Sequence, residues 1–325
     1  MVRFFFKPKI KKSVLVAAWP GMGSVAFRTV SYLVKKLGAK EFAEIPSIHY
    51  YSPTAVTANN GVIQPPYFPK NRFYYYSTNQ SSQDIIMFLG EAQPSSSNQY
   101  EFAKEVVNLA RRLDVKLIYT MAGMLTYEDK QEDLRVWSVA TNLQFVNRLR
   151  AYNVSPMKKA HISGLNGLLL GVAKEMGTPG ICLLGELPYY AIQIEYTPSC
   201  LAVLKVLTRM LNIKIDMEEM EKSSLVCKRQ IQKILAQLKQ AKEQGAGGEL
   251  MHTEEEEGDL MKRIEKELGI SSEVPEYVKR RIENLFEKAQ KDISKAYELK
   301  ALLDKWELFS YYEDRFLDLF KRKNQ

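Results

Sequence analysis

The sequence is poor in cysteine and contains no long apolar run. Its three cysteines, Cys182, Cys200 and Cys227, are far apart and form no C-x-x-C pair. This pattern excludes a disulfide framework and a cysteine zinc site, and it fits a reducing compartment. No run reaches about 18 apolar residues, and the first residues, MVRFFFKPKIKK, lack the apolar core of a signal peptide. We therefore expect a cytoplasmic protein with no membrane partner.

Histidine and the usual catalytic motifs are also scarce. The three histidines are His49, His161 and His252, and none has a partner at metal-ligand spacing. The chain has no H-E-x-x-H and no G-x-S-x-G motif. His161 precedes the loop SGLNG, where both a catalytic and a structural role are open to it. The sequence thus predicts no metal, no cofactor and no catalytic residue, which favours a protein that is not an enzyme.

The positive charge is concentrated in the first part of the chain. The net charge is +8, and the first 200 residues hold 22 Lys and Arg against 14 Asp and Glu. A basic half of this kind can contact nucleic acid or an acidic protein surface. A solvated, lysine-rich surface explains it equally, and the residues show no aromatic and arginine motif of an RNA-binding module.

Residues 1–215 alternate short apolar runs with amphipathic helix patterns. Ser24 is a suitable N-cap for the helix expected over 25–36. Such alternation indicates a three-layer α/β/α sandwich with a mainly parallel sheet. Further strands are expected within 14–18, 84–94, 116–124 and 178–187, and further helices within 98–115 and 164–177.

The loop after the first strand contains closely spaced glycines. Gly21, Gly23 and Ala26 match the form of a dinucleotide-binding loop, G-x-G-x-x-A. The acidic residue that such a site places about 20 residues further on is Glu41 or Glu44, and neither closes a clear strand. A tight structural turn without a nucleotide is therefore the favoured interpretation.

Two segments differ from this alternation. Residues 48–79 are rich in tyrosine and contain the turn pair Asn60-Gly61, which predicts a β-hairpin excursion; stacking of bases on its tyrosines is the alternative. Residues 216–325 are expected to form a helical region with a flexible acidic linker at 245–259. Its first part, 217–244, is predicted to be a polar helix with an apolar stripe at Leu225, Ile231, Ile234, Leu235 and Leu238. Beyond the linker, apolar residues at three- and four-residue steps predict a helical hairpin or coiled coil.

Two glutamates follow apolar strands. Glu91 stands in FLGEAQP and Glu186 in LLGELPYY. The carboxyl ends of parallel strands border the ligand crevice of α/β proteins, so these side chains are candidates to bind a hydroxyl group or a cation. They are equally suited to hold loops by accepting backbone N–H bonds.

The order of the loops resembles that of a known family. The succession LVAAWPGMGSVA, LGEAQPSSSNQYEFAKEVVNLARRLDVKLIYTMAGM, HISGLNGLLLGVAKEMGTPGICLLGELPYY and EYTPSCLAVLKVLTRMLNIKID is similar to the proteasome assembly chaperone 2 family, in its archaeal branch. The resemblance covers about residues 8–240. It implies an α/β/α fold like that of purine nucleoside phosphorylases, a tendency to oligomerise, and protein partners. Eukaryotic relatives act in pairs on proteasome α-ring assembly, and archaeal relatives have been linked to the proteasome.

The resemblance does not extend to the last residues. Proteasome binders of the family use a tail of a hydrophobic residue, Tyr and any residue, where this chain has Lys323, Asn324 and Gln325. We therefore expect contact with a partner through a surface rather than through docking of the tail.

The phosphorylase-like fold also implies a pocket at the strand ends. We expect a non-enzymatic, homo-oligomeric protein-binding factor, with proteasome subunits as candidate partners. A hydrolase or transferase acting on a nucleoside-like ligand is the alternative, and a ribosome- or RNA-associated factor is a third. The pocket of the alternative would be lined by Gly21, Met22, Gly23, Glu91, Ala122, Gly123, Asn166 and Glu186.

Overall fold

The structure is a computed structural model, and it describes residues 2–10, 12–52, 56, 58–77, 83–126, 134–159, 162–244 and 276–305, together with 312, 315, 316 and 319. The chain separates into two compact units, residues 1–264 and 265–325. The boundary expected at residue 215 stays a prediction. The acidic linker, His161, His252 and the last three residues lie outside the described parts of the chain.

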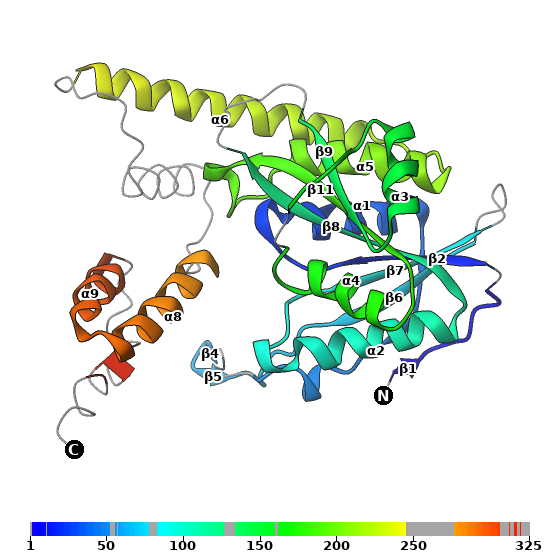
Figure 1. The fold of residues 1–325 in the computed structure, drawn as a ribbon, viewed down its shortest axis with the longest axis horizontal. Helices are drawn as coiled ribbons and strands as arrows, with labels where there is room; N and C mark the ends of the chain where they lie inside the picture. Colours follow the sequence, from blue (N-terminus) through cyan, green and yellow to red (C-terminus); the bar gives the residue numbers. More distant parts are fainter. Residues whose placement is uncertain are drawn as a thin grey trace. The chain divides into compact units, whose positions relative to one another are not determined.

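A mixed sheet of nine strands forms the centre of the first unit (Figure 1), in the order β1-β3-β6-β7-β2-β8-β11-β9-β10. The sequence predicts a mainly parallel sheet, and the four central strands β7, β2, β8 and β11 are mutually parallel. The flanking pairs β1–β3, β3–β6, β6–β7 and β9–β11 are antiparallel. The strands are β1 (Arg3–Phe4), β2 (Ser13–Ala18), β3 (Lys40–Glu44), β6 (Asn71–Tyr76), β7 (Asp84–Gly90), β8 (Val115–Thr126), β9 (Val136–Ala140), β10 (Ser155–Pro156) and β11 (Gly180–Pro188).

Helices cover both faces of this sheet (Figure 1), which confirms the α/β/α sandwich. α1 (Val25–Leu37), α5 (Thr197–Leu211) and α6 (Glu218–Gln244) lie on one face, and α2 (Gln99–Arg112) and α4 (Leu165–Glu175) on the other. Short elements complete the unit: α3 (Leu143–Leu149), η1 (Met22–Ser24), η2 (Ser47–His49), η3 (Ser96–Asn98), η4 (Arg150–Tyr152), η5 (Tyr189–Ala191), and a hairpin of β4 (Ala58–Asn59) and β5 (Val62–Ile63).

The main core lies between the sheet and α2 with α4. Its aromatic centre joins Trp19 to Phe88 at a centroid distance of 4.9 Å, and Phe88 to Phe73 at 4.6 Å. Phe102 of α2 packs edge-on against Trp19 and Phe88. These side chains are fully buried, and such aromatic pairs add to the stabilisation that burial provides. This core fixes the end of β2, from which the glycine loop starts.

The helix expected over 25–36 is α1, but its predicted cap is wrong. Ser24 has a φ of 51°, in the left-handed region, and its side chain makes no capping bond. Gly23 before it also has a positive φ, of 62°, so the turn into α1 contains two successive left-handed residues. At its other end α1 is closed by Gly38 in the left-handed conformation, a frequent helix terminator.

The second unit contains α8 (Glu276–Lys291), η6 (Ile293–Lys295) and α9 (Ala296–Lys305). Its helices share an apolar core that includes Ile282, Phe286 and Leu299. Arg315 pairs with Glu283 through two contacts of 2.6 Å, and its guanidinium lies 4.1 Å from the ring centroid of Phe286. The helical C-terminal extension is confirmed, whereas the coiled coil stays a prediction.

Candidate functional site

The loop after β2 lies at the carboxyl edge of the parallel strands, where α/β proteins bind ligands. Two backbone bonds fasten it to the segment before α5: Gly23 N donates to Ile192 O at 2.8 Å, and Tyr196 N donates to Gly23 O at 3.0 Å. The carbonyl and amide of Gly23 are therefore occupied within the protein. The tight turn predicted from the glycines is present, and Ser24 N closes it by donating to Gly21 O at 2.9 Å.

Asn166 is at the start of α4, on the face of the sheet opposite to α1, and its side chain binds the residue at which this loop begins. Its side chain is 3% exposed. Asn166 Oδ1 accepts from Trp19 N and Asn166 Nδ2 donates to Trp19 O, each at 3.0 Å. A Cβ added to Gly21 would lie 3.4 Å from Asn166 Nδ2, so the loop backbone passes close to this amide. Asn166 thus acts in the structure as a clamp on the end of β2.

Gln93 makes a second clamp, which the sequence analysis missed. Gln93 Nε2 donates to Pro20 O at 2.8 Å, and Gln93 Oε1 accepts from Leu165 N at 2.9 Å. The amide therefore joins the loop after β2 to the first turn of α4. Because Gln93 follows the carboxyl end of β7 by three residues, the rule that selected Glu91 could also have selected it.

Gly123 of β8 faces the same loop at close range. A Cβ at this position would lie 2.8 Å from Met22 O and 2.3 Å from Leu187 Cδ2. Leu187 is also close to Gly23: a Cβ added to Gly23 would lie 3.4 Å from Leu187 Cδ1. The glycine is therefore needed for the loop to pack against β8. The absence of a side chain at Gly123 allows the backbone of the loop to lie close to β8.

The two candidate glutamates lie at different places. Glu186 lies inside β11 rather than at its end, and it is buried. It accepts from Trp137 Nε1 at 2.7 Å and from Arg135 N at 3.0 Å. Glu91 accepts from Lys70 N at 2.9 Å and from the Tyr67 hydroxyl. Both carboxylates hold neighbouring backbone and side-chain donors.

The structure therefore brings together part of the predicted set. Gly21, Met22, Gly23, Gly123 and Asn166 surround one loop. Glu186 binds donors next to and within β9, and Glu91 binds donors in the segment before β6, so both carboxylates bind parts of the chain other than that loop. A ligand role for these residues stays a prediction.

The buried thiols have no nucleophilic character near neutral pH. Burial raises the pKa of Cys182 to about 12, and it also raises the pKa of Cys200. Both side chains are fully buried, and a thiol must ionise to react. In the parts of the chain that the structure describes, no group of three His, Cys, Asp or Glu side chains is arranged to hold a metal ion. None of the described helices is long and apolar enough to span a membrane.

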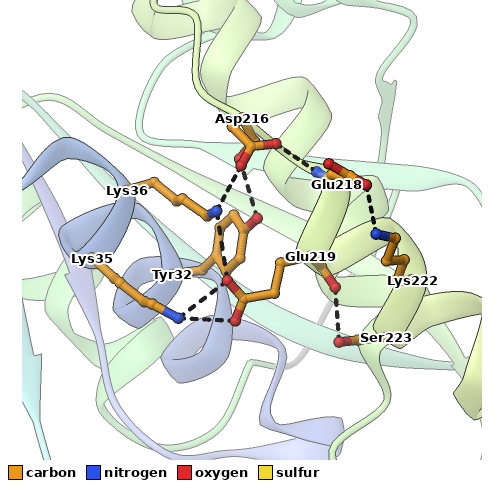
Figure 2. A network of polar contacts seen from close by, with 8 residues as sticks. All are labelled: Tyr32, Lys35, Lys36, Asp216, Glu218, Glu219, Lys222 and Ser223. Carbon is orange, nitrogen blue, oxygen red and sulfur yellow. Dashed lines mark hydrogen bonds and ion pairs between the residues drawn. The ribbon is translucent and has the colours of Figure 1, made fainter.

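A polar network joins α1 to the start of α6 (Figure 2). Lys36 Nζ lies 2.7 Å from Asp216 Oδ2, and Lys35 Nζ lies 2.9 Å from Glu219 Oε1. The Tyr32 hydroxyl donates to the backbone oxygen of Asp216 at 3.1 Å. Most of these charged groups are exposed, so each ion pair contributes little by itself. Asp216 also accepts from Glu218 N at 2.9 Å, as an N-cap does for a helix start.

Beneath this network, Met220 of α6 packs into an apolar cluster with Tyr32 and Leu204. Further along α6, Ile231 and Ile234 are buried as the stripe predicted, whereas Leu225 is exposed. The first half of α6 is therefore fixed to the α/β unit by an apolar cluster and an ionic border. We call the ionic border, Lys35, Lys36, Asp216 and Glu219, the α6 clasp.

The uncharacterized protein MJ1210 of Methanocaldococcus jannaschii is 27% identical over 227 residues, 69% of this chain and 84% of that protein. PbaB of Pyrococcus furiosus, described as an archaeal proteasome activator, is 25% identical with a TM-score of 0.62, over 74% of this chain and 98% of PbaB. PbaA of the same organism, described as an archaeal homologue of proteasome-assembly chaperone, is 23% identical with a TM-score of 0.57, over 75% of this chain and 95% of PbaA, and supports the fold.

The sequence model of the PAC2 family matches residues 15–235. This range includes the glycine loop, both clamps and the first half of α6, and it ends before α8 and α9. The resemblance noted in the sequence is thereby confirmed: the chain belongs to the PAC2 family.

Proposed function

We propose that this chain is a non-enzymatic, oligomeric factor of the cytoplasm that binds other proteins, with proteasome subunits as partners. Membership of the PAC2 family and the likeness to PbaB, an archaeal proteasome activator, support a chaperone-like role.

The proposal rests on the hydrogen bonds that polar side chains make at the carboxyl edge of the sheet. The polar side chains at the carboxyl edge of the sheet bond to the protein itself: Asn166 to Trp19, and Gln93 to Pro20 and Leu165. An enzyme needs an acid, base or nucleophile directed at its substrate. Side chains committed to the loop backbone stabilise that loop, and a rigid edge of this kind suits a binding surface.

The nucleoside-like enzyme of the alternative reading requires other contacts. Its pocket would need Glu91 and Glu186 free to turn toward a ligand. Glu186 binds Trp137 and Arg135, and Glu91 binds Tyr67 and Lys70. Replacing Glu91 by Gln is therefore expected to leave partner binding unchanged, whereas an enzyme that uses this carboxylate would lose its activity.

The test is affinity capture from extracts of the source cells, followed by mass spectrometry. The baits are the tagged full chain, its Glu91→Gln variant and a shorter chain ending at Gln244. We expect proteasome α-subunits with all three baits, because the family match ends at residue 235. If the full chain retains no proteasome subunit, the proposed partner is wrong. Retention of ribosomal proteins that falls steeply with added salt would favour the RNA-associated reading.

A further inference from the structure

Lysine and arginine side chains gather at the edge of the sheet where the parallel strands β2, β7 and β8 begin. Lys12 directly precedes β2, Lys40 is the first residue of β3, and Arg111 lies in the last turn of α2. Lys9 belongs to the segment that leads to β2. All four side chains are exposed. We call Lys9, Lys12, Lys40 and Arg111 the basic edge.

Strand pairing and a hydrogen bond place Lys9 beside Lys40. The pairs β3–β6 and β6–β7 are antiparallel and the pair β7–β2 is parallel, so β3 and β2 run in the same direction and begin at the same edge. Tyr75, near the end of β6, pairs with Lys40, and its hydroxyl donates to Lys9 O at 3.2 Å. The backbone of Lys9 is thus held next to the start of β3.

Two further bonds bring Lys12 and the end of α2 to this edge. Asp84 N, at the start of β7, donates to Lys12 O at 2.7 Å. Ser13 Oγ, at the start of β2, donates to Leu113 O at 3.1 Å, and Leu113 follows the last turn of α2. Because β3, β6, β7 and β2 are successive neighbours, about 4.8 Å apart, the basic edge extends over about 14 Å between β3 and β2.

The acidic groups at this edge have partners of their own. Asp84 is buried and accepts from two hydroxyl groups, at 3.1 and 3.2 Å. Asp114 pairs with Lys116, and Glu41 pairs with Arg72 at 3.2 Å. None of the acids that the structure describes forms an ion pair with a side chain of the basic edge. The edge therefore carries positive charge that no described acid neutralises by direct contact.

This positive charge exceeds what the helix ends at the edge require. A helix C-terminus carries a partial charge of about −0.5, and Arg111 compensates it for α2. α1 has Lys35 and Lys36 in its own last turn. Lys12 and Lys40 lie outside the helices, and the first 40 residues contain nine Lys and Arg but no Asp or Glu. Such a surplus of one sign indicates a polyanionic partner.

Two exposed aromatic rings precede the basic edge in the chain. The side chains of Phe5 and Phe6 are 47% and 42% exposed. Their backbone amides both donate to Phe42 O of β3, at 2.8 and 3.4 Å, so this segment is held beside the strand that Lys40 begins. Exposed rings next to cations are the combination on which proteins stack the bases of single strands.

We infer that the basic edge, together with Phe5 and Phe6, binds single-stranded nucleic acid. A protein partner fits less well, because protein interfaces are depleted of lysine, whereas interfaces with nucleic acid are strongly positive. A duplex also fits less well, since its paired and stacked bases cannot reach the two rings. In a single strand, phosphates meet the cations and bases stack on the rings. The inference goes beyond the proposed function, because it assigns a second kind of partner to the opposite edge of the sheet.

The test measures the fluorescence anisotropy of a labelled oligouridine of about 20 nucleotides, titrated with purified full-length protein at several salt concentrations. One double variant carries Lys9→Glu with Lys12→Glu. The matched control carries Lys158→Glu with Lys159→Glu, which changes the net charge by the same amount. These two lysines are exposed and follow β10, at the far end of the strand order. Circular dichroism checks that each variant is folded.

We expect the wild-type protein to bind oligouridine with a Kd of about 10 μM at physiological salt. The logarithm of the binding constant should fall with the logarithm of the salt concentration with a slope of about −3, for four phosphate contacts. The Lys9 and Lys12 double variant should bind at least ten-fold more weakly, with a slope smaller by about 1.4 because two contacts are lost. The control variant should keep the wild-type slope and lose less than about three-fold in affinity.

A further variant, Phe5→Ala with Phe6→Ala, tests the stacking. It should bind at least five-fold more weakly with an unchanged salt slope, because stacking releases no counterions. Oligothymidine of the same length separates the two kinds of strand: equal affinity assigns recognition to phosphates and bases, and weaker binding assigns it to RNA, and both support the inference.

Four results would overturn the inference. The first is no binding of oligouridine by the wild-type protein at about 50 mM salt. The second is an equal loss of affinity in the two lysine variants, which would reflect net charge alone. The third is equally tight binding of duplex RNA. The fourth is displacement of oligouridine by poly-glutamate at equal charge, which would identify an acidic protein chain as the partner. None of these results depends on proteasome capture, so the two proposals fail separately.

Discussion

Asn166 satisfies both backbone groups of Trp19, although 147 positions separate the two residues in the chain. At the end of β2, the side-chain amide of Asn166 supplies the donor and the acceptor that the backbone of a paired strand supplies elsewhere. The backbone groups of Trp19 are buried, and buried polar groups without partners are costly. The amide thereby sets where the strand ends and the glycine loop begins.

Removing this amide is expected to destabilise the α/β unit. In Asn166→Ala, the N–H and the C=O of Trp19 both lose their partner, and each orphaned group costs about 1 to 3 kcal/mol. We expect a loss of about 2 to 4 kcal/mol in the free energy of unfolding, measured by urea denaturation with tryptophan fluorescence. The matched control is Asn108→Ala on the exposed face of α2, expected to change it by less than about 0.5 kcal/mol. Equal losses in the two variants would contradict the clamp.

Alanine substitutions at Gly123 and Gly171 are expected to have opposite effects on the stability of the protein. In Gly123→Ala the new methyl group meets Leu187 Cδ2 at 2.3 Å and Met22 O at 2.8 Å, so we expect destabilisation by about 1 to 3 kcal/mol. In Gly171→Ala, within α4, nothing lies within 4 Å of the new atom, and we expect stabilisation by about 0.5 to 1 kcal/mol from helix propensity. Thermal unfolding of both variants checks the pair. A Gly123→Ala variant as stable as wild type would show that the packing around Gly123 is looser than described.

Much of the fold follows from local patterns in the sequence. The apolar run at 14–18 coincides with β2, and the periodic helix over 25–36 coincides with α1. The pair Asn60-Gly61 marks the turn of the β4–β5 hairpin. These elements are specified by residues close together in the chain, because turn chemistry and amphipathic spacing act over short distances.

The details of the candidate site depend on contacts between distant residues. Gln93 bonds to Leu165 across 72 positions, and no local pattern announces that pairing. The sequence predicts that Ser24 caps α1, but its backbone is left-handed in the turn and its side chain makes no capping bond. Leu225 belongs to the apolar stripe predicted for α6, yet its side chain is exposed. Tertiary packing decides each of these outcomes, and the sequence pattern alone does not contain it.

The buried thiols are expected to resist modification in the native protein. With a pKa of about 12, Cys182 is ionised to about one part in ten thousand at pH 8, and Cys200 is equally buried. We expect an aromatic disulfide reagent at pH 8 to leave both residues unmodified in native protein and to modify all three cysteines in urea. Peptide mass spectrometry assigns the sites. Rapid native modification of Cys182 or Cys200 would mean that the core opens readily.

The α6 clasp is expected to make stability fall in acid. The Lys36 ammonium lowers the pKa of Asp216, and the Lys35 ammonium lowers the pKa of Glu219. A carboxylate with a lowered pKa in the folded state stabilises that state above its unfolded pKa, near 4, and this contribution disappears as pH falls through the folded pKa. Between pH 7 and pH 3 the wild-type protein should therefore lose more thermal stability than the double variant Asp216→Asn with Glu219→Gln.

The clasp lies at the surface, so the difference between wild type and variant should be small and should shrink in 1 M salt. Glu101→Gln is the matched control, because Glu101 pairs with Lys104 of the same helix, α2. Hydrogen exchange adds a local readout: in the double variant, the amides at the start of α6 should exchange faster, while those of α2 stay unchanged. If the two proteins lose stability in parallel as the pH falls, and α6 exchanges equally in both, then the apolar contact of Met220 holds the helix without the ionic border.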